Sequence, residues 1–139
     1  MIIDMRRGDI FEAPYQHIAF ATNIQGHGDE GFAGQVSSRF WPELADLGPK
    51  KLGEVLSHTV DGKTFHAIVC HSLRGYGWQD TPRVLEECLN SLDIPNDETI
   101  AIVAIGSGKS GQKHGADTFA IFGAMARSNK RLAIFNRKG

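Results

Sequence analysis

Cysteine and long apolar runs are scarce in this sequence of 139 residues. Its two cysteines, Cys70 and Cys88, are too few for the disulfide framework that stabilises small secreted domains. We therefore expect two buried free thiols in a cytoplasmic protein. No apolar stretch approaches the roughly 20 residues of a membrane-spanning helix, and residues 1–7 are not followed by the apolar segment of a signal peptide. We expect no membrane partner.

Charge of one sign is not concentrated anywhere in the chain. The sequence has 15 Lys and Arg against 16 Asp and Glu, a formal net charge of −1, and no run of basic residues. Nucleic-acid-binding proteins need a basic face that displaces counterions from phosphates, so we expect no nucleic-acid partner. Hydrophobic residues make up 41% and charged residues 22%, as in ordinary globular chains. The length fits one domain over residues 1–139.

Apolar runs separated by turn residues predict a series of short strands. The run 18–22 is apolar throughout and is typical of a central strand that is buried on both faces. Asp61 and Gly62 stand between two apolar runs and predict a β-hairpin. The predicted strands cover residues 2–5, 18–22, 55–60, 64–70, 100–105 and 132–135.

Helical patterns lie between several of these strands. Large apolar residues stand at every fourth position over residues 32–40, and Pro42 ends or kinks this helix. Thr81 is typical of an N-cap, with Pro82 at the first helical position, and a further helix is expected over residues 117–128. The alternation predicts an α/β fold, with a mixed central sheet of about six strands and helices on its faces.

Two glycine-rich segments, 23–31 and 106–111, each follow a predicted central strand. In open α/β sheets, ligands bind outside the carboxyl ends of the strands. Glycine lets the backbone approach a ligand closely, and a loop that enters a helix presents the positive end of the helix dipole. Two such loops favour a ligand with more than one anionic group, such as a diphosphate. The alternative is that both segments are simply tight turns.

The second segment contains Gly108-Lys109-Ser110, which matches the end of a P-loop. The complete motif requires a glycine at position 103, where this chain has Val103 inside the predicted strand. The sequence therefore argues against a P-loop, although Lys109 and the nearby backbone amides could still hold a phosphate.

Three segments carry a resemblance to a known family. They are Gly8-Asp9-Ile10, then Asn23-Ile24-Gln25-Gly26 with Gly31-Phe32-Ala33, and Ile105-Gly106-Ser107-Gly108. Together they resemble the macro domain family, which binds ADP-ribose, and are closest to its small hydrolases of terminal ADP-ribose and of ADP-ribose-1″-phosphate. The resemblance spans residues 1–136 and implies a three-layer α/β/α fold.

The resemblance also implies roles for particular residues. Asp9 would accept a hydrogen bond from the adenine amino group, beside the backbone of Ile10, and Asn23 would face the distal ribose. The other implied binding positions are Gln25 and Gly26 beside that ribose, and Gly31, Phe32, Ala33, Ser107, Gly108, Lys109, Ser110 and Gly111 around the diphosphate. From the residues alone, Asp9 can equally cap its own turn and Asn23 its own loop.

The sequence departs from the family pattern in both loops. Asp29 and Glu30 stand where the family has glycine or small residues, and two carboxylates repel a diphosphate unless they turn toward solvent. Ser110 stands where some of the hydrolases have a catalytic aspartate, and His71-Ser72 where they have a lysine. The catalytic sets of those hydrolases are therefore not intact.

Three functions follow as hypotheses. The first is an enzyme that hydrolyses an ADP-ribosyl linkage or ADP-ribose-1″-phosphate, with Asn23 orienting the substrate and His27, Asp29 or His71 as general base. The second is a non-catalytic module that binds ADP-ribose, an ADP-ribosylated protein or a related nucleotide. The third is a protein-interaction role with a degenerate pocket, which the acidic pair Asp29-Glu30 favours.

Two features concern the surroundings of the site. The segment Arg74-Gly75-Tyr76-Gly77-Trp78 is either a mobile flap that stacks Tyr76 or Trp78 on a ligand, or a loop whose aromatic residues pack on the core. Cys70-His71 is the only pair of candidate metal ligands on one predicted element, and the two side chains point to opposite faces of a strand. We expect no metal and no other cofactor.

Overall fold

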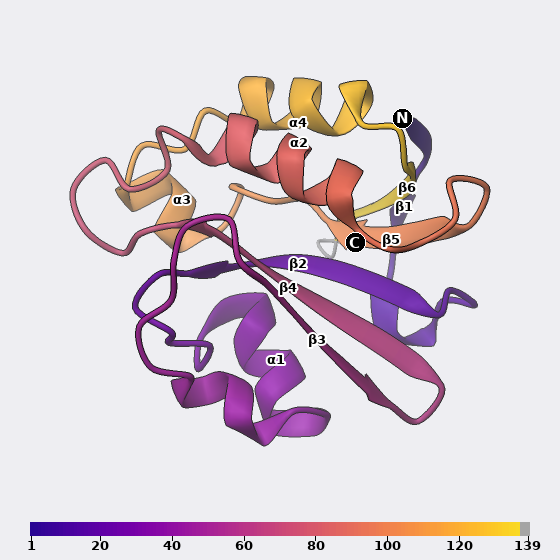
Figure 1. Ribbon diagram of the computed structural model, residues 1–139, viewed down its shortest axis with the longest axis horizontal. Coiled ribbons are helices and arrows are strands. Elements are labelled where there is room, and N and C mark those ends of the chain that lie inside the picture. Colours follow the sequence, from indigo (N-terminus) through magenta and orange to yellow (C-terminus); the bar gives the residue numbers. More distant parts are fainter. Residues whose placement is uncertain (137–139) are drawn as a thin grey trace.

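The computed structural model describes residues 1–136, in which six strands form one mixed sheet of order β1-β6-β5-β2-β4-β3 (Figure 1). Residues 137–139, the end of the predicted domain 1–139, lie outside the described residues. All neighbouring strands are parallel except β3 and β4. The strands are β1 (Ile2–Arg7), β2 (His17–Asn23), β3 (Val55–Val60), β4 (Lys63–His71), β5 (Thr99–Val103) and β6 (Arg131–Asn136).

Helices cover both faces of this sheet (Figure 1). One face carries α2 (Thr81–Ser91) and α4 (Thr118–Arg127), and the opposite face carries α1 (Gly31–Arg39). The short helix α3 (Lys109–Lys113) and the 3-10 turns η1 (Ile10–Glu12) and η2 (Pro42–Asp46) complete the helical elements. The predicted three-layer α/β/α fold with a mixed sheet of about six strands is confirmed.

Each face of the sheet has its own apolar core. Leu85 and Leu89 of α2 pack with Ile102 of β5 on one face. On the other face, Val36 of α1 packs with Phe20 of β2. The central strands contribute to both cores, and this explains why their sequences are apolar without alternation. Both cysteines are buried and free, as predicted.

The β3–β4 hairpin forms where the Asp-Gly pair predicted it. Asp61 and Gly62 have φ angles of 52° and 76°, so both lie in the left-handed region that a two-residue hairpin turn requires. Asp61 is the one described non-glycine residue with a positive φ. In the sheet, β3 of this hairpin forms one edge, and β1 forms the other.

The predicted N-cap of α2 is wrong by one residue. Asp80 occupies the N-cap position, and Thr81 is the first residue of the helix. The Thr81 side chain is fully buried, and its Oγ1 donates a hydrogen bond to the carbonyl oxygen of Cys70 over 2.6 Å. The hydroxyl thus links the start of α2 to β4 rather than capping its own helix, a tertiary contact that local sequence does not encode.

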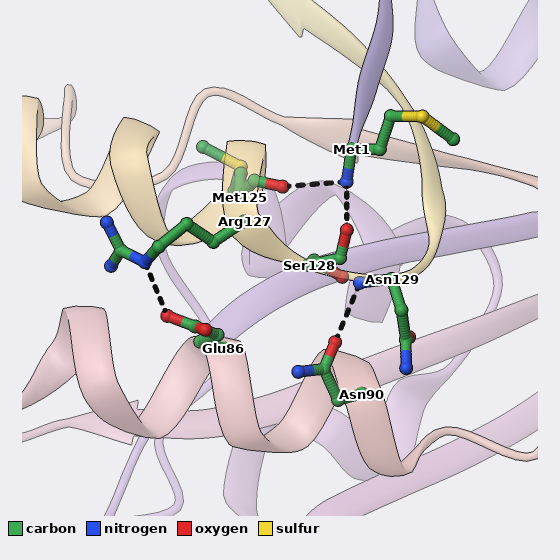
Figure 2. A network of polar contacts seen from close by, with 7 residues as sticks. All are labelled: Met1, Glu86, Asn90, Met125, Arg127, Ser128 and Asn129. Carbon is green, nitrogen blue, oxygen red and sulfur yellow. Dashed lines mark hydrogen bonds and ion pairs between the residues drawn. The ribbon is translucent and has the colours of Figure 1, made fainter.

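Polar contacts join the ends of α2 and α4 (Figure 2). Arg127 Nε donates to Glu86 Oε1 over 3.0 Å, and the backbone N–H of Asn129 donates to Asn90 Oδ1 over 2.9 Å. The amino group of Met1 lies 3.0 Å from a carbonyl oxygen near the end of α4. These contacts fasten α4 to α2 and the start of the chain to the end of α4, on the face of the sheet opposite α1.

No helix within residues 1–136 combines the length and the apolar character that crossing a membrane requires.

We expect Thr81→Val to lower the free energy of unfolding by about 1–3 kcal/mol, because the buried Cys70 carbonyl loses a hydrogen bond. Thr118→Val is the matched control, since Thr118 is also the first residue of its helix but is exposed, and a change within about 0.5 kcal/mol is expected there. Urea unfolding followed by circular dichroism measures both. Equal effects of the two substitutions would contradict the role given to Thr81.

Candidate functional site

The two glycine-rich loops meet at one cavity of about 560 Å³, at the carboxyl ends of β2, β4 and β5. Asn23 and His71 are the last residues of β2 and β4, and both line it. From the loops, the cavity receives the predicted positions His27, Gly31, Phe32, Ala33, Gly108, Lys109, Ser110 and Gly111. The volume lies in the range of small-molecule sites, about 300–1,000 Å³.

Asn23 holds the first loop closed. Its Nδ2 donates to the carbonyl oxygen of His27 over 2.8 Å, and its Oδ1 accepts from the backbone N–H of His27 over 3.1 Å. The side chain is buried at the edge of the cavity, and its amide is committed to the loop. Asn23 therefore caps its own loop, as one interpretation of the sequence predicted, and it also positions the backbone that carries His27.

Gln25 and Gly26 support the loop from behind and do not line the cavity. Gln25 Nε2 donates to Ser72 Oγ over 2.9 Å, and Gln25 Oε1 accepts from the backbone N–H of Leu73 over 3.0 Å. Gly26 has φ +75°, and a Cβ there would overlap the carbonyl of Gly48. Both residues thus tie the first loop to its neighbours.

The N-terminus of α1 faces the cavity. Its N-cap residue, Glu30, has extended backbone, and within the described residues its side chain makes no capping hydrogen bond. Gly31, Phe32 and Ala33 form the first turn and line the cavity. The amides of that turn and the helix dipole favour an anionic group there. Asp29 and Glu30 are exposed and line the same cavity, so negative charge stands beside this turn.

The second loop turns sharply at Gly106, with φ +92°, and enters α3. Ser107 is not among the cavity residues, and its Oγ donates to the carbonyl oxygen of Ala104 over 2.7 Å, which stabilises the turn. Lys109 is exposed at the cavity and is the one lysine or arginine among its lining residues. The sequence did not predict α3, because five residues rich in small and polar side chains carry no apolar period.

The segment 74–78 sends its two aromatic residues in different directions. Trp78 is buried and stacks on His71, with ring centroids 3.9 Å apart. Its Nε1 donates to Ser110 Oγ over 3.1 Å, which joins this segment to the second loop. Tyr76 is 79% exposed. Trp78 therefore packs on the core and forms part of the cavity wall, whereas Tyr76 lies outside.

The two candidate histidines differ in environment. His27 is exposed and lines both the main cavity and a neighbouring open groove with Asp46 and Arg74. His71 is buried, and this burial lowers the pKa of its imidazole to about 4. A hydrogen bond with the Ser72 backbone raises that pKa by a smaller amount, and the charge of His114 lowers it further. His71 is therefore neutral near pH 7, whereas His27 stands exposed at the cavity mouth.

A second groove, of about 300 Å³, adjoins the cavity, and both are lined by Phe32 and Val103. Asp9 and Ile10 line this groove. Asp9 Oδ1 accepts from the backbone N–H of Phe11 over 2.9 Å, so the carboxylate caps the turn η1, as one of the sequence interpretations held. Two residues predicted to meet adenine thus lie in a groove that shares Phe32 and Val103 with the cavity.

No group of three or more His, Cys, Asp or Glu side chains within residues 1–136 is placed to hold a metal ion.

No protein-family profile and no curated protein sequence matches this chain. Solved structures do match. The macrodomain of Mycobacterium tuberculosis DarG superposes with a TM-score of 0.67 at 18% identity, over 98% of this chain and 97% of that chain. The chain has the macrodomain fold.

Two further solved structures match this chain over part of their own length. Thermosipho africanus DarTG in complex with ADP-ribose has a TM-score of 0.66 and 14% identity, over 97% of this chain and 42% of that chain. An alphavirus P23pro-zbd structure has a TM-score of 0.66 and 17% identity, over 95% of this chain and 21% of that chain. This chain thus spans less than half of either protein.

Some residues that line the cavity, among them Thr22 and Leu73, were not predicted from the sequence. Thr22 lies at the end of β2, and Leu73 follows β4. Thr22 could have been found, because it directly precedes Asn23 at the carboxyl end of a strand. Leu73 could not, because its place depends on how the segment after β4 folds back onto the first loop.

We expect Gly26→Ala to destabilise the protein by about 1–3 kcal/mol more than Gly62→Ala. The two glycines have nearly equal φ angles, +75° and +76°, but an added Cβ overlaps Gly48 only at Gly26 and meets nothing within 4 Å at Gly62. The cost of placing alanine in the left-handed region, about 1–2 kcal/mol, is therefore common to both variants and cancels in the difference between them. Thermal and urea unfolding measure the difference, and equal losses would show that the Gly26–Gly48 approach is not tight in solution.

Proposed function

We propose that this protein binds ADP-ribose or a closely related adenine nucleotide in the cavity between its two glycine-rich loops. The observation that carries this proposal is that the 560 Å³ cavity and the 300 Å³ groove that holds Asp9 adjoin, with Phe32 and Val103 lining both. An elongated ligand with an adenine at one end and a diphosphate near its middle matches that shape. The similarity in fold to a DarTG structure that contains ADP-ribose supports the same ligand.

Each part of such a ligand has a partner along this path. The free oxygen of the Asp9 carboxylate would accept from the adenine amino group, since its Oδ1 caps the turn. The first turn of α1 and the loop from Gly106 to Gly111 would hold the phosphates through backbone amides, with Lys109 beside them. Asn23 would fix the loop around the distal sugar rather than bind it with its own amide.

The acidic pair limits how tightly anions bind. Asp29 and Glu30 line the cavity together with one cation, Lys109, so the charged lining residues sum to a negative formal charge. Both carboxylates are exposed, and solvent screens them from a phosphate at the helix terminus. Backbone amides therefore supply most of the attraction for a diphosphate.

A cytoplasmic location is part of the proposal. Its support is that both cysteines are free and buried, as is usual in reducing compartments.

We expect wild-type protein to bind ADP-ribose in calorimetric titration, and Asp9→Asn to weaken this binding about tenfold. The Asn Oδ1 keeps the bond to Phe11 N–H, and its amino group then faces the amino group of adenine, so two donors meet. Inosine diphosphate ribose has a carbonyl oxygen in place of the adenine amino group. It should bind to Asp9→Asn at least as tightly as it binds to the wild type.

Glu12→Gln is the control for this prediction, because Glu12 lies in the same turn but is exposed and does not line the groove. Undetectable binding of ADP-ribose to the wild type at millimolar concentration would contradict the proposed function and favour a protein-interaction role. Unchanged affinity in Asp9→Asn would remove Asp9 from the site.

Hydrolysis of an ADP-ribosyl linkage is a second candidate function, and the placement of His27 favours it. His27 lies exposed at the cavity mouth, and Asn23 fixes its backbone on both sides of the His27 Cα, through the N–H and the carbonyl oxygen. An imidazole there could take a proton from a water that attacks the anomeric carbon of the distal ribose, while the bond from that carbon to the acceptor breaks. The leaving acceptor takes a proton from solvent, and the imidazolium afterwards returns its proton to solvent.

If the protein is such an enzyme, we expect His27→Ala to slow release of ADP-ribose from an ADP-ribosylated protein about 100-fold or more, the usual loss for a general base. Affinity for ADP-ribose should stay within about twofold. His58→Ala is the control, because His58 stacks on Trp41 outside the cavity. Absence of turnover by pure wild-type protein that binds ADP-ribose would assign the non-catalytic binding role.

A further inference from the structure

Four polar side chains form a hydrogen-bonded chain that runs across the sheet, away from the cavity. Ser57 Oγ lies 2.7 Å from His66 Nδ1, and His66 Nε2 lies 3.0 Å from His17 Nδ1. His17 Nε2 in turn lies 3.3 Å from Glu98 Oε1. The first three residues stand on the neighbouring strands β3, β4 and β2, and Glu98 directly precedes β5. None of the four lines the main cavity, so the proposed function does not use them.

The chain leads from solvent into the sheet and back to its surface. Ser57 is exposed on the edge strand β3. His66 is only 6% exposed, and the side chain of His17 is 14% exposed. His17 is the first residue of β2, whereas the cavity lies at the carboxyl end of that strand. An accessible hydroxyl is thus joined through two largely buried rings to the carboxylate of Glu98.

The donors and acceptors give this chain a direction. A carboxylate only accepts hydrogen bonds, and a neutral imidazole has one donor and one acceptor. With Glu98 as a carboxylate, a neutral His17 donates from Nε2 and accepts at Nδ1, so His66 also donates from Nε2 and accepts at Nδ1. Ser57 must then donate its proton to His66. Nucleophilic serines have this connectivity, with a base about 2.6–3.2 Å away that a third group orients.

The proton that leaves Ser57 does not have to charge the buried ring. Burial, and to a smaller extent the charge of His17, lower the pKa of His66 to about 4, so His66 is neutral near pH 7. When His66 takes the serine proton at Nδ1, it passes its other proton from Nε2 to His17. The positive charge then lies on His17 beside the Glu98 carboxylate. Two rings in series therefore let a buried base act without becoming charged itself.

The backbone of Ser57 supplies a donor beside the hydroxyl. The two-residue turn of the β3–β4 hairpin joins Val60 to Lys63 by the turn hydrogen bond, and hydrogen-bonded pairs alternate from there. Ser57, opposite His66, falls at a position that is not hydrogen-bonded to β4, so its N–H points outward from the sheet edge. The oxyanion formed when Ser57 attacks a carbonyl group would accept a hydrogen bond from this N–H.

We propose that Ser57 is the nucleophile of a second site, which hydrolyses small activated esters with His66 as its base. Oγ attacks the ester carbonyl carbon while its proton passes to His66. The bond from that carbon to the alcohol oxygen then breaks, and His66 returns the proton to the leaving alcohol. A water molecule repeats the step on the acyl-serine, which releases the carboxylic acid and restores Ser57. His17 and Glu98 are positioning residues, which act through His66.

The experiment treats the whole chain with a fluorophosphonate and locates the adduct by mass spectrometry. Ser57 Oγ displaces fluoride from phosphorus, and the proton passes to His66. We expect an adduct on Ser57 and none on Ser38, which is also exposed but donates to a carbonyl oxygen of its own helix. Hydrolysis of p-nitrophenyl acetate measures turnover, and Ser57→Ala should lower nitrophenol release to the rate of the uncatalysed reaction.

Variants along the chain separate reactivity from structure. His66→Gln should slow labelling of Ser57 about 100-fold, the usual loss for a general base, and Glu98→Gln about tenfold. If His66→Gln does not fold, Glu98→Gln decides the question, because the Glu98 side chain is 40% exposed. Glu87→Gln is the matched control, since Glu87 pairs with Arg83 on the surface of α2, and its labelling rate should equal that of the wild type.

The pH profile of labelling gives a readout that a merely structural role would not move. Labelling requires a neutral His17, which Glu98 faces from the segment before β5 and His66 faces from β4. Removal of the carboxylate disfavours protonated His17, so labelling of Glu98→Gln should reach half of its maximum at a lower pH than labelling of the wild type.

The outcomes are decisive without reference to the cavity, because neither probe contains a nucleotide. Labelling of Ser57 no faster than of Ser38 would overturn the proposal. Equal nitrophenol release by the wild type and Ser57→Ala would overturn it as well. An unchanged rate and pH profile in Glu98→Gln would show that the chain only satisfies buried polar groups, and the assigned nucleophile would then have no activated base.

Discussion

The parallel pairing of β2 with both β4 and β5 is the constraint on which the rest of this structure depends. Parallel strands bring their carboxyl ends to the same edge of the sheet, so the segments that follow each strand must leave from one place. The first loop, the segment 72–78 and the second loop are far apart in sequence but line one cavity for this reason. The apolar central strands, buried on both faces, make that edge rigid enough to carry a site.

Several polar and glycine residues of the site serve the shape of the loops rather than a ligand. Asn23 binds the backbone of its own loop, and Gln25 joins that loop to the segment after β4. Ser107 Oγ donates a hydrogen bond within its own turn, and Ser110 Oγ accepts one from the indole N–H of Trp78. These contacts hold the backbone amides in place before any ligand arrives, and preorganised amides bind anions without an ordering cost at that moment. The polar side chains of these two loops thus position the loop backbone, and the backbone amides are the groups that face the cavity.

The fold was largely predictable because its determinants are local. The Asp61-Gly62 turn set the β3–β4 hairpin, and the apolar runs located all six strands to within a few residues at each end. The site was predictable only in part. That both glycine-rich segments border one cavity follows from strand order, whereas the burial of Trp78 against His71 depends on tertiary packing that no local pattern encodes. Thr81 shows the same limit, since its hydroxyl serves β4 instead of its own helix.

The cavity combines features that act against one another in the free protein. Two unpaired buried atoms, Thr22 Oγ1 and His71 Nδ1, lower its stability, and the carboxylates of Asp29 and Glu30 stand beside a helix terminus that attracts anions. Neither feature helps the protein fold. Since Lys109 is the one lysine or arginine that lines the cavity, an anionic ligand there would depend on backbone amides and neutral hydrogen bonds more than on ion pairs.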